Sequence, residues 1–239
     1  MSRTLADSLR WAEEGTKLFS AELQRLGTSD EAFTAPSVLP GWSIKHLVGH
    51  VGKNAEAIAN LATWASTGVE TPMYSSPSQR NADIEASVTK TPEALIESFE
   101  SSAVALTEAW DFLSDEEWQV EVRTAQGRLV PASETPWMRT REVMVHSVDL
   151  GTGLTFADLA EDFLVALATD IVGKRSAAGH QPALTIAPTD SRERWTISGT
   201  GDSVTVTGSL ANLTAWLAGR STDGVETSTG ELPTLPAWL

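Results

Sequence analysis

Apolar residues recur at helical spacing in four segments of the N-terminal part of the chain, and this periodicity limits the possible folds more than any other feature. The segments cover residues 4–26, 43–67, 92–113 and 133–151. A helix with one apolar face buries that face by packing against other helices. We therefore predict a four-helix bundle that contains at least one long crossover connection.

The ends of these segments carry residues that start or stop helices. Gly27 follows the first segment and favours its end. The residues 28–42 and 68–90 contain several prolines and are predicted to be loops, and the second is long for a compact domain, which often indicates function. Residues that favour the N-cap position precede the other three segments: Ser43, Thr91 and Ser133.

The pattern changes after the fourth segment. Residues 157–178 are predicted to form a helix, and "PALTIAP", "ERWTISG" and "DSVTVTGS" have the alternation of short strands. A helix capped by Ser209, a last strand in "GVETSTG" and an extended tail follow. The predicted fold class is α+β, with a bundle over residues 1–152 and a small α/β domain over residues 153–239.

Composition excludes several classes of function. Among 239 residues, 17 are Lys or Arg and 32 are Asp or Glu, and a net charge of −15 disfavours both nucleic acids and anionic membranes as partners. The chain has no cysteine, so any thiol chemistry needs a thiol from outside. No signal peptide and no apolar run of about 18 residues is present, and we expect a cytoplasmic protein.

The fourth segment places polar side chains where packing residues are expected. Glu142 and His146 are four residues apart and share one helix face, and a buried carboxylate needs a partner. With His50, predicted to face the bundle interior, they would form a His₂Glu site that suits zinc or another divalent ion. Asp149 is expected to hydrogen-bond a histidine and fix its tautomer.

Two other interpretations of these residues stay open. His46 and His50 are also four residues apart and form a competing ligand pair. Glu142 and His146 are also compatible with a hydrogen-bonded pair in the core that binds no metal. His180 follows a helix break, is expected to be exposed and is given no role.

Arginines are the natural side chains to hold carboxylates. Arg139 and Arg141 flank Glu142, and Arg128 lies in "TAQGRLVP". We predict that Arg80, in the long loop, and Arg220, at the end of the last helix, hold a small dicarboxylate substrate, because a planar guanidinium pairs with a carboxylate through two hydrogen bonds.

The segments "LPGWSIKHLVGHVGKNAEAI" and "TAQGRLVPASETPWMRTREVMVHSVDLG" resemble the mycothiol-dependent maleylpyruvate isomerase family, within the DinB-like metal-binding superfamily. The resemblance extends to "ETPMYSSPSQRN" and to the C-terminal "GRSTDGVETSTGELPTLPAWL". It implies a DinB-like bundle followed by a small α/β domain. It also implies a Zn²⁺ ion bound by three residues: His50, Glu142 and His146.

The activity implied by this resemblance is an isomerase reaction of gentisate degradation, from maleylpyruvate to fumarylpyruvate. The thiolate of mycothiol adds to the cis double bond, the new single bond rotates, and the thiolate leaves. Metal coordination keeps such a thiol deprotonated. The expected partners are thus mycothiol and a dicarboxylate, and the sequence is compatible with a monomer.

Other functions stay open. A different mycothiol S-transferase would keep the metal ligands and act on a neutral electrophile. A non-enzymatic module could bind an apolar ligand in the C-terminal part, loosely like a sterol-carrier domain. A bundle with buried His–Glu pairs and no metal is the third alternative.

Overall fold

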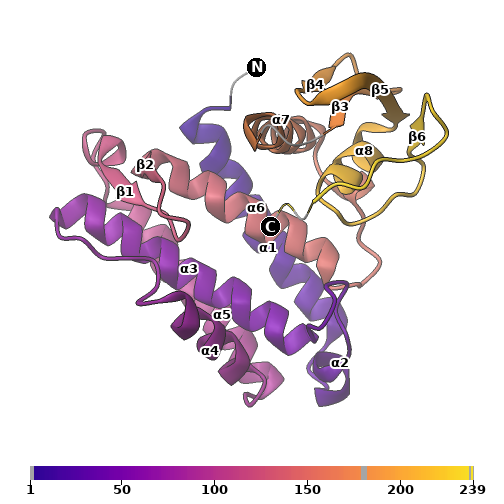
Figure 1. The fold of residues 1–239 in the computed structure, drawn as a ribbon. Coiled ribbons are helices and arrows are strands. Elements are labelled where there is room, and N and C mark those ends of the chain that lie inside the picture. The colour runs from indigo at the N-terminus through magenta and orange to yellow at the C-terminus, as the bar shows by residue number, and fades with distance from the viewer. Residues whose placement is uncertain (1–2, 179–181, 237, 239) are drawn as a thin grey trace. The chain divides into compact units, whose positions relative to one another are not determined.

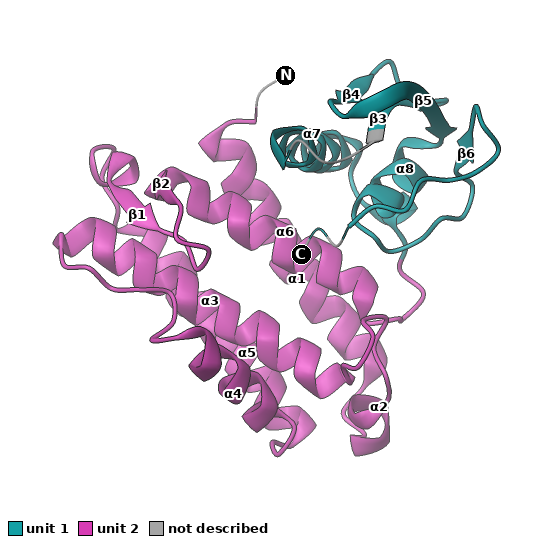
Figure 2. Cartoon of the chain, in the orientation of Figure 1, with its two compact units in different colours: residues 1–2, 155–239 teal, residues 3–154 magenta. Residues whose placement is uncertain are grey.

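The computed structural model describes residues 3–178, 182–236 and 238, which form two compact units. Residues 3–154 make up the larger unit, and the described residues from 155 onward make up the smaller (Figure 2). Within the described residues, no helix is both long and apolar enough to cross a membrane. The predicted α+β class is confirmed, since a helical unit precedes a small unit that contains a sheet.

The larger unit is built on four long helices, labelled in Figure 1. α1 packs against α6, α3 packs against α5, and α3 also contacts α6. The predicted helices therefore exist, and Thr91 caps α5 through a hydrogen bond from the Ala94 amide. The bounds of the four helices are α1 Leu5–Leu26, α3 Ile44–Thr67, α5 Pro92–Asp111 and α6 Thr135–Asp149.

Three local predictions in this unit were wrong. The predicted loop 28–42 contains a short helix, α2 Asp30–Thr34, and the predicted loop 68–90 contains α4 Pro77–Ser87. Ser133 does not cap α6, because it lies inside a 3₁₀ turn that leads into that helix. The reason for α4 is local: the Ser76 hydroxyl accepts a hydrogen bond from the Gln79 amide, and Pro77 occupies the first turn.

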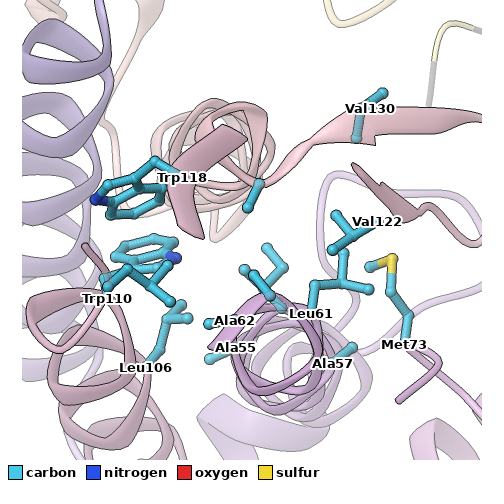
Figure 3. Close-up of a cluster of buried hydrophobic side chains, with 14 of the residues drawn as sticks. Ala55, Ala57, Leu61, Ala62, Met73, Leu106, Trp110, Trp118, Val122 and Val130 are labelled. Carbon is cyan, nitrogen blue, oxygen red and sulfur yellow. The ribbon is translucent and has the colours of Figure 1, made fainter. Parts of the chain in front are cut away.

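A short hairpin closes one end of the bundle core. β1 Glu121–Arg123 and β2 Leu129–Pro131 pair in antiparallel register, with Val122 opposite Val130. Both valines belong to the same buried apolar cluster as Leu61 and Trp110, which Figure 3 shows. The hairpin thus lies in the connection from α5 to α6.

In its described residues, the smaller unit combines two α-helices with a four-stranded sheet in the order β4-β3-β5-β6. β3 and β5 are parallel, and the other pairs are antiparallel. The predicted strands and the cap by Ser209 are confirmed, whereas the first helix begins at Glu161 instead of residue 157. The bounds are α7 Glu161–Ala178, β3 Pro182–Pro188, β4 Trp195–Ile197, β5 Thr200–Gly208, α8 Leu210–Leu217 and β6 Glu226–Thr227.

Candidate metal centre

Two helices of the bundle bring three ligand-type side chains together. His50 comes from the first half of α3, and Glu142 and His146 come from consecutive turns of α6. The Nε2 atom of His50 lies 2.9 Å from Glu142 Oε2, and the Nε2 atom of His146 lies 3.2 Å from the same oxygen. We call these three residues the triad. They are the one group of at least three His, Cys, Asp or Glu in the described chain with metal-binding spacing, and their ligand atoms all lie within 4.8 Å of one another.

Packing fixes the orientation of both imidazoles. His50 and His146 are almost fully buried, and their rings meet edge to face with centroids 5.1 Å apart. His146 Nδ1 lies 2.8 Å from Oδ2 of the fully buried Asp149, which confirms the predicted hydrogen bond. Because the carboxylate accepts a hydrogen bond from Nδ1–H, the lone pair of the neutral His146 imidazole is on Nε2, the atom that would bind a cation.

The charges of the triad are set by its neighbours as well as by burial. Burial alone raises the pKa of Glu142, but His50 and His146 outweigh it and hold that pKa well below its usual value. Burial lowers the pKa of His50 despite the adjacent Glu142. Burial also acts to lower the pKa of His146, but the hydrogen bonds to Asp149 and Glu142 raise that pKa. An ionised carboxylate is thus held between two imidazoles.

These features fit a divalent cation. Two imidazole nitrogens and one carboxylate oxygen are the donors of three-ligand zinc sites, which keep a fourth position for water or substrate. The two histidines lie on the same carboxylate oxygen, so the three donor atoms already converge on one small volume. Asp149 supplies the outer hydrogen bond that metal-bound histidines commonly make.

Arg80 lies beside the triad, although it comes from α4 and not from the loop that the sequence predicted. Its Nη2 atom is 3.4 Å from Nδ1 of His50, and its guanidinium carbon is 5.9 Å from the ring centroid of Tyr74. Burial and the charge of Glu142 raise the pKa of Tyr74, and Arg80 opposes them. Tyr74 is therefore neutral at neutral pH and adds a hydroxyl next to the guanidinium.

Two aromatic neighbours of the triad, Tyr74 and Trp42, were not predicted from the sequence. Tyr74 was not singled out, although it is the one tyrosine of the chain and lies in the unusual segment 68–90. Trp42 packs edge to face on His50, with ring centroids 5.3 Å apart. Trp42 lies just before the helix that carries His46 and His50, and this position could have indicated that it lies near the site.

His46 is not part of the triad. His46 accepts a hydrogen bond from the Ser43 amide at 3.2 Å and directs Nε2 towards Glu85, so it caps α3 and does not pair with His50. Arg220 lies beyond the end of α8 in the smaller unit, where its Nη1 donates to the carbonyl of Ala218. His180 lies outside the described residues.

Comparisons with known proteins cover nearly the whole chain. The model of the mycothiol maleylpyruvate isomerase N-terminal domain matches residues 13–151, and the model of the C-terminal domain of the same family matches residues 158–237. Among curated proteins, none matches the chain.

Two solved structures match over almost their full length. A crystal structure of a mycothiol-dependent maleylpyruvate isomerase is 44% identical, with a TM-score of 0.93 over 99% of this chain and 98% of that chain. A crystal structure of a histidine-to-alanine mutant of such an isomerase is 43% identical, with the same TM-score and coverage.

Proposed function

The chain belongs to the mycothiol maleylpyruvate isomerase family, and from this premise we propose that it catalyses the mycothiol-dependent cis–trans isomerisation of maleylpyruvate to fumarylpyruvate. One observation carries the proposal. In a chain that is 44% identical to such an enzyme over 99% of its length, the two imidazoles and the carboxylate of the triad converge with their ligand atoms within 4.8 Å.

We propose that His50, Glu142 and His146 hold a Zn²⁺ ion. Their donor set favours zinc, although other divalent ions use the same ligands. A cation held there would keep the thiol of mycothiol deprotonated, so that the thiolate adds reversibly to the cis double bond. The addition converts the double bond to a single bond, rotation about it is free, and elimination leaves the trans isomer with no net oxidation.

The protein's own contribution is to bind and orient the dicarboxylate. We propose that Arg80 pairs with one carboxylate, because its guanidinium lies within 3.4 Å of His50. When Nε2 of His50 ligates a cation, Nδ1 carries the proton and no longer accepts from Arg80. The donors of Arg80 are then available to substrate. The hydroxyl of Tyr74 lies next to that guanidinium and is suited to donate to the same carboxylate.

We propose that Arg220 pairs with the second carboxylate and that it does so from a separate domain. In this proposal, residues 1–152 form the metal-binding domain, and residues 153–239 form the domain that supplies Arg220. Arginine suits this task better than lysine, since its planar fork matches a carboxylate.

The experiment measures bound zinc and mycothiol-dependent loss of maleylpyruvate on one preparation, beside the variants His50→Ala and His46→Ala. His46 is a matched control, because it lies one turn earlier on α3 and caps that helix instead of joining the triad. We expect one zinc per chain and thiol-dependent turnover in the wild type and in His46→Ala, and the loss of both in His50→Ala.

Two results would contradict the proposal. Stoichiometric zinc with turnover of a neutral electrophile, and none of maleylpyruvate, would assign the chain to another mycothiol S-transferase. Neither zinc nor turnover in the wild type would make the triad a polar element of the core.

A further inference from the structure

A pocket of about 530 Å³ lies in the larger unit, between the segment that leads into α4 and the turn that joins β1 to β2. It is lined on one side by residues between positions 70 and 80, and on the other side by residues 123–127. We call it the hairpin pocket. Its volume lies within the range of small-molecule sites.

The hairpin pocket adjoins the triad through two side chains. Arg80 and Tyr74 both line the pocket, and Nη2 of Arg80 lies 3.4 Å from Nδ1 of His50. None of the triad residues is among the described residues that line the pocket itself. A ligand of the hairpin pocket would therefore lie beside the groups that we propose to hold the substrate, and not on the metal ligands.

Hydrogen bonds hold the two walls of the pocket in place. The amide of Ala125, in the turn of the hairpin, donates to Sδ of Met73 at 3.2 Å and so ties the two walls together. The side-chain amide of Asn60 on α3 donates to the carbonyl of Pro72 at 3.3 Å. The pocket is therefore formed before a ligand arrives, and binding does not have to order either wall.

Three exposed side chains of the pocket wall have polar atoms available to a ligand: Glu70, Arg123 and Gln126. Within the described residues, the guanidinium of Arg123 makes one hydrogen bond, from Nη1 to the carbonyl of Gly127 at 3.3 Å, and the side chains of Glu70 and Gln126 make none. Together they offer donors and acceptors. A hydroxyl group both donates and accepts, so this set suits a ligand with several hydroxyl groups.

The charge and the apolar part of the wall favour the same class of ligand. Arg123 and Glu70 have opposite charges, so they give no excess charge that would attract an ion. Pro72, Met73 and Pro77 add apolar surface, against which the C–H faces of a sugar ring can pack. The hairpin pocket is thus suited to a neutral, polyhydroxylated molecule.

The thiol that the family uses has such a part. Mycothiol carries its cysteine on a glucosamine–inositol unit, which is neutral and rich in hydroxyl groups. We propose that the hairpin pocket binds this unit and that Arg123 and Gln126 determine the specificity for mycothiol over smaller thiols. This inference rests on the proposed function, and it leaves Arg80 and Tyr74 to the dicarboxylate.

The test uses S-methylmycothiol and S-methyl-N-acetylcysteine as probes, which share a blocked thiol and differ in the sugar unit. Isothermal titration calorimetry on the full-length protein should give at least about tenfold tighter binding of S-methylmycothiol. Arg123→Ala should weaken the binding of S-methylmycothiol by about tenfold and leave that of the smaller probe unchanged. Arg128→Ala is the matched control: it removes an exposed arginine of the same turn that does not line the pocket, and it should keep the preference of the wild type.

A second variant tests the pocket without removing a charge. Ala125→Trp fills the pocket from its exposed wall and leaves Arg123 and the triad intact, so it should also weaken the binding of S-methylmycothiol by about tenfold or more. Equal affinities of the wild type for the two probes would overturn the inference. So would an unchanged affinity for S-methylmycothiol in folded Arg123→Ala or in folded Ala125→Trp.

These measurements are independent of the isomerase reaction, because neither probe has a reactive thiol. A wild type that binds S-methylmycothiol with the expected preference and does not consume maleylpyruvate would support the hairpin pocket and contradict the proposed function. A wild type that consumes maleylpyruvate and has equal affinities for the two probes would do the reverse.

Discussion

Asp149 lies 2.8 Å from Nδ1 of His146, three residues earlier on the same helix, and is fully buried. The contact fixes which imidazole nitrogen carries the proton, so that Nε2 is left to face Glu142. The carboxylate of Asp149 thereby orients Nε2 of His146 towards Glu142. The proposed metal site therefore depends on Asp149, although Asp149 is not one of its three ligands.

Replacement of Asp149 should therefore weaken the metal site. In Asp149→Asn, the affinity for zinc should fall by about 10- to 100-fold, because the tautomer and the ring orientation of His146 are no longer held. Competition with a chromogenic chelator measures this affinity. Asp115→Asn removes an exposed carboxylate elsewhere and should leave it unchanged. Equal affinities in the two variants would show that Asp149 has only a packing role.

The acid stability of the metal-free protein should depend on Glu142. Its pKa in the folded state is well below the usual value of 4.5, because the two histidines favour its charged form against the effect of burial. A carboxyl group with a lowered pKa stabilises the fold above its unfolded pKa, and this contribution is lost as the pH falls through the folded pKa.

Urea unfolding of the chelated protein at several pH values tests this dependence. The difference in unfolding free energy between the wild type and Glu142→Gln should be largest above about pH 4.5 and should shrink as the pH falls further. A difference that stays constant over this range would contradict the assignment of the low pKa to Glu142.

The proposed carboxylate clamps can be separated from the metal site by kinetics. Arg80→Ala and Arg220→Ala should each lower kcat/KM for maleylpyruvate by at least about tenfold and leave bound zinc unchanged, because a guanidinium–carboxylate pair is lost and no ligand is removed. Arg80→Lys should restore only part of the activity.

Arg128→Ala is the matched control for these variants, since it removes an exposed arginine from the turn between β1 and β2. It should keep the activity of the wild type. If Arg80→Ala and Arg220→Ala both keep the KM and kcat of the wild type, the clamp proposal is wrong.

The close packing of α4 on α3 depends on a glycine. A Cβ atom at Gly49 would overlap the side chain of Ser87, at the end of α4. Gly49→Ala should therefore destabilise the fold by about 1–3 kcal/mol and displace the helix that carries Arg80. Thermal unfolding and the KM for maleylpyruvate measure the two effects.

A second substitution checks this explanation. Ser87→Gly removes the side chain that the new methyl group meets, so the double variant should recover much of the lost stability. If the two substitutions are strictly additive, the overlap with Ser87 is not the cause of the destabilisation.

The long helices were predictable because their signals are local. Periodic apolar residues together with the caps at Ser43 and Thr91 predicted α3 and α5 closely. The helices that were not predicted from the sequence, α2 and α4, are short. α4 has a cap and an N-terminal proline, but its apolar face is weak, and only packing against α3 stabilises it as a helix.

The candidate site was likewise predictable only in part, where the signal is local to one helix. The four-residue spacing of Glu142 and His146 on one helix established their shared face, and the apolar stripe of its own helix directed His50 to the bundle interior. The resemblance to a family then identified His50 as the third ligand. Periodicity alone left His46 as an alternative, since both histidines lie on α3. The contact with Ser43 that removes His46 from the site is visible only in the folded chain.

The sequence by itself determined which long segments are helical, that no thiol is available within the chain, and which residue types could bind a metal. The tertiary structure decided which of them meet, because the distance from His50 to Glu142 depends on how α3 packs against α6. It also decided that Arg139 is buried and donates to Val51 and Asn54 of α3, since burial is a property of the whole bundle and not of any segment of the chain.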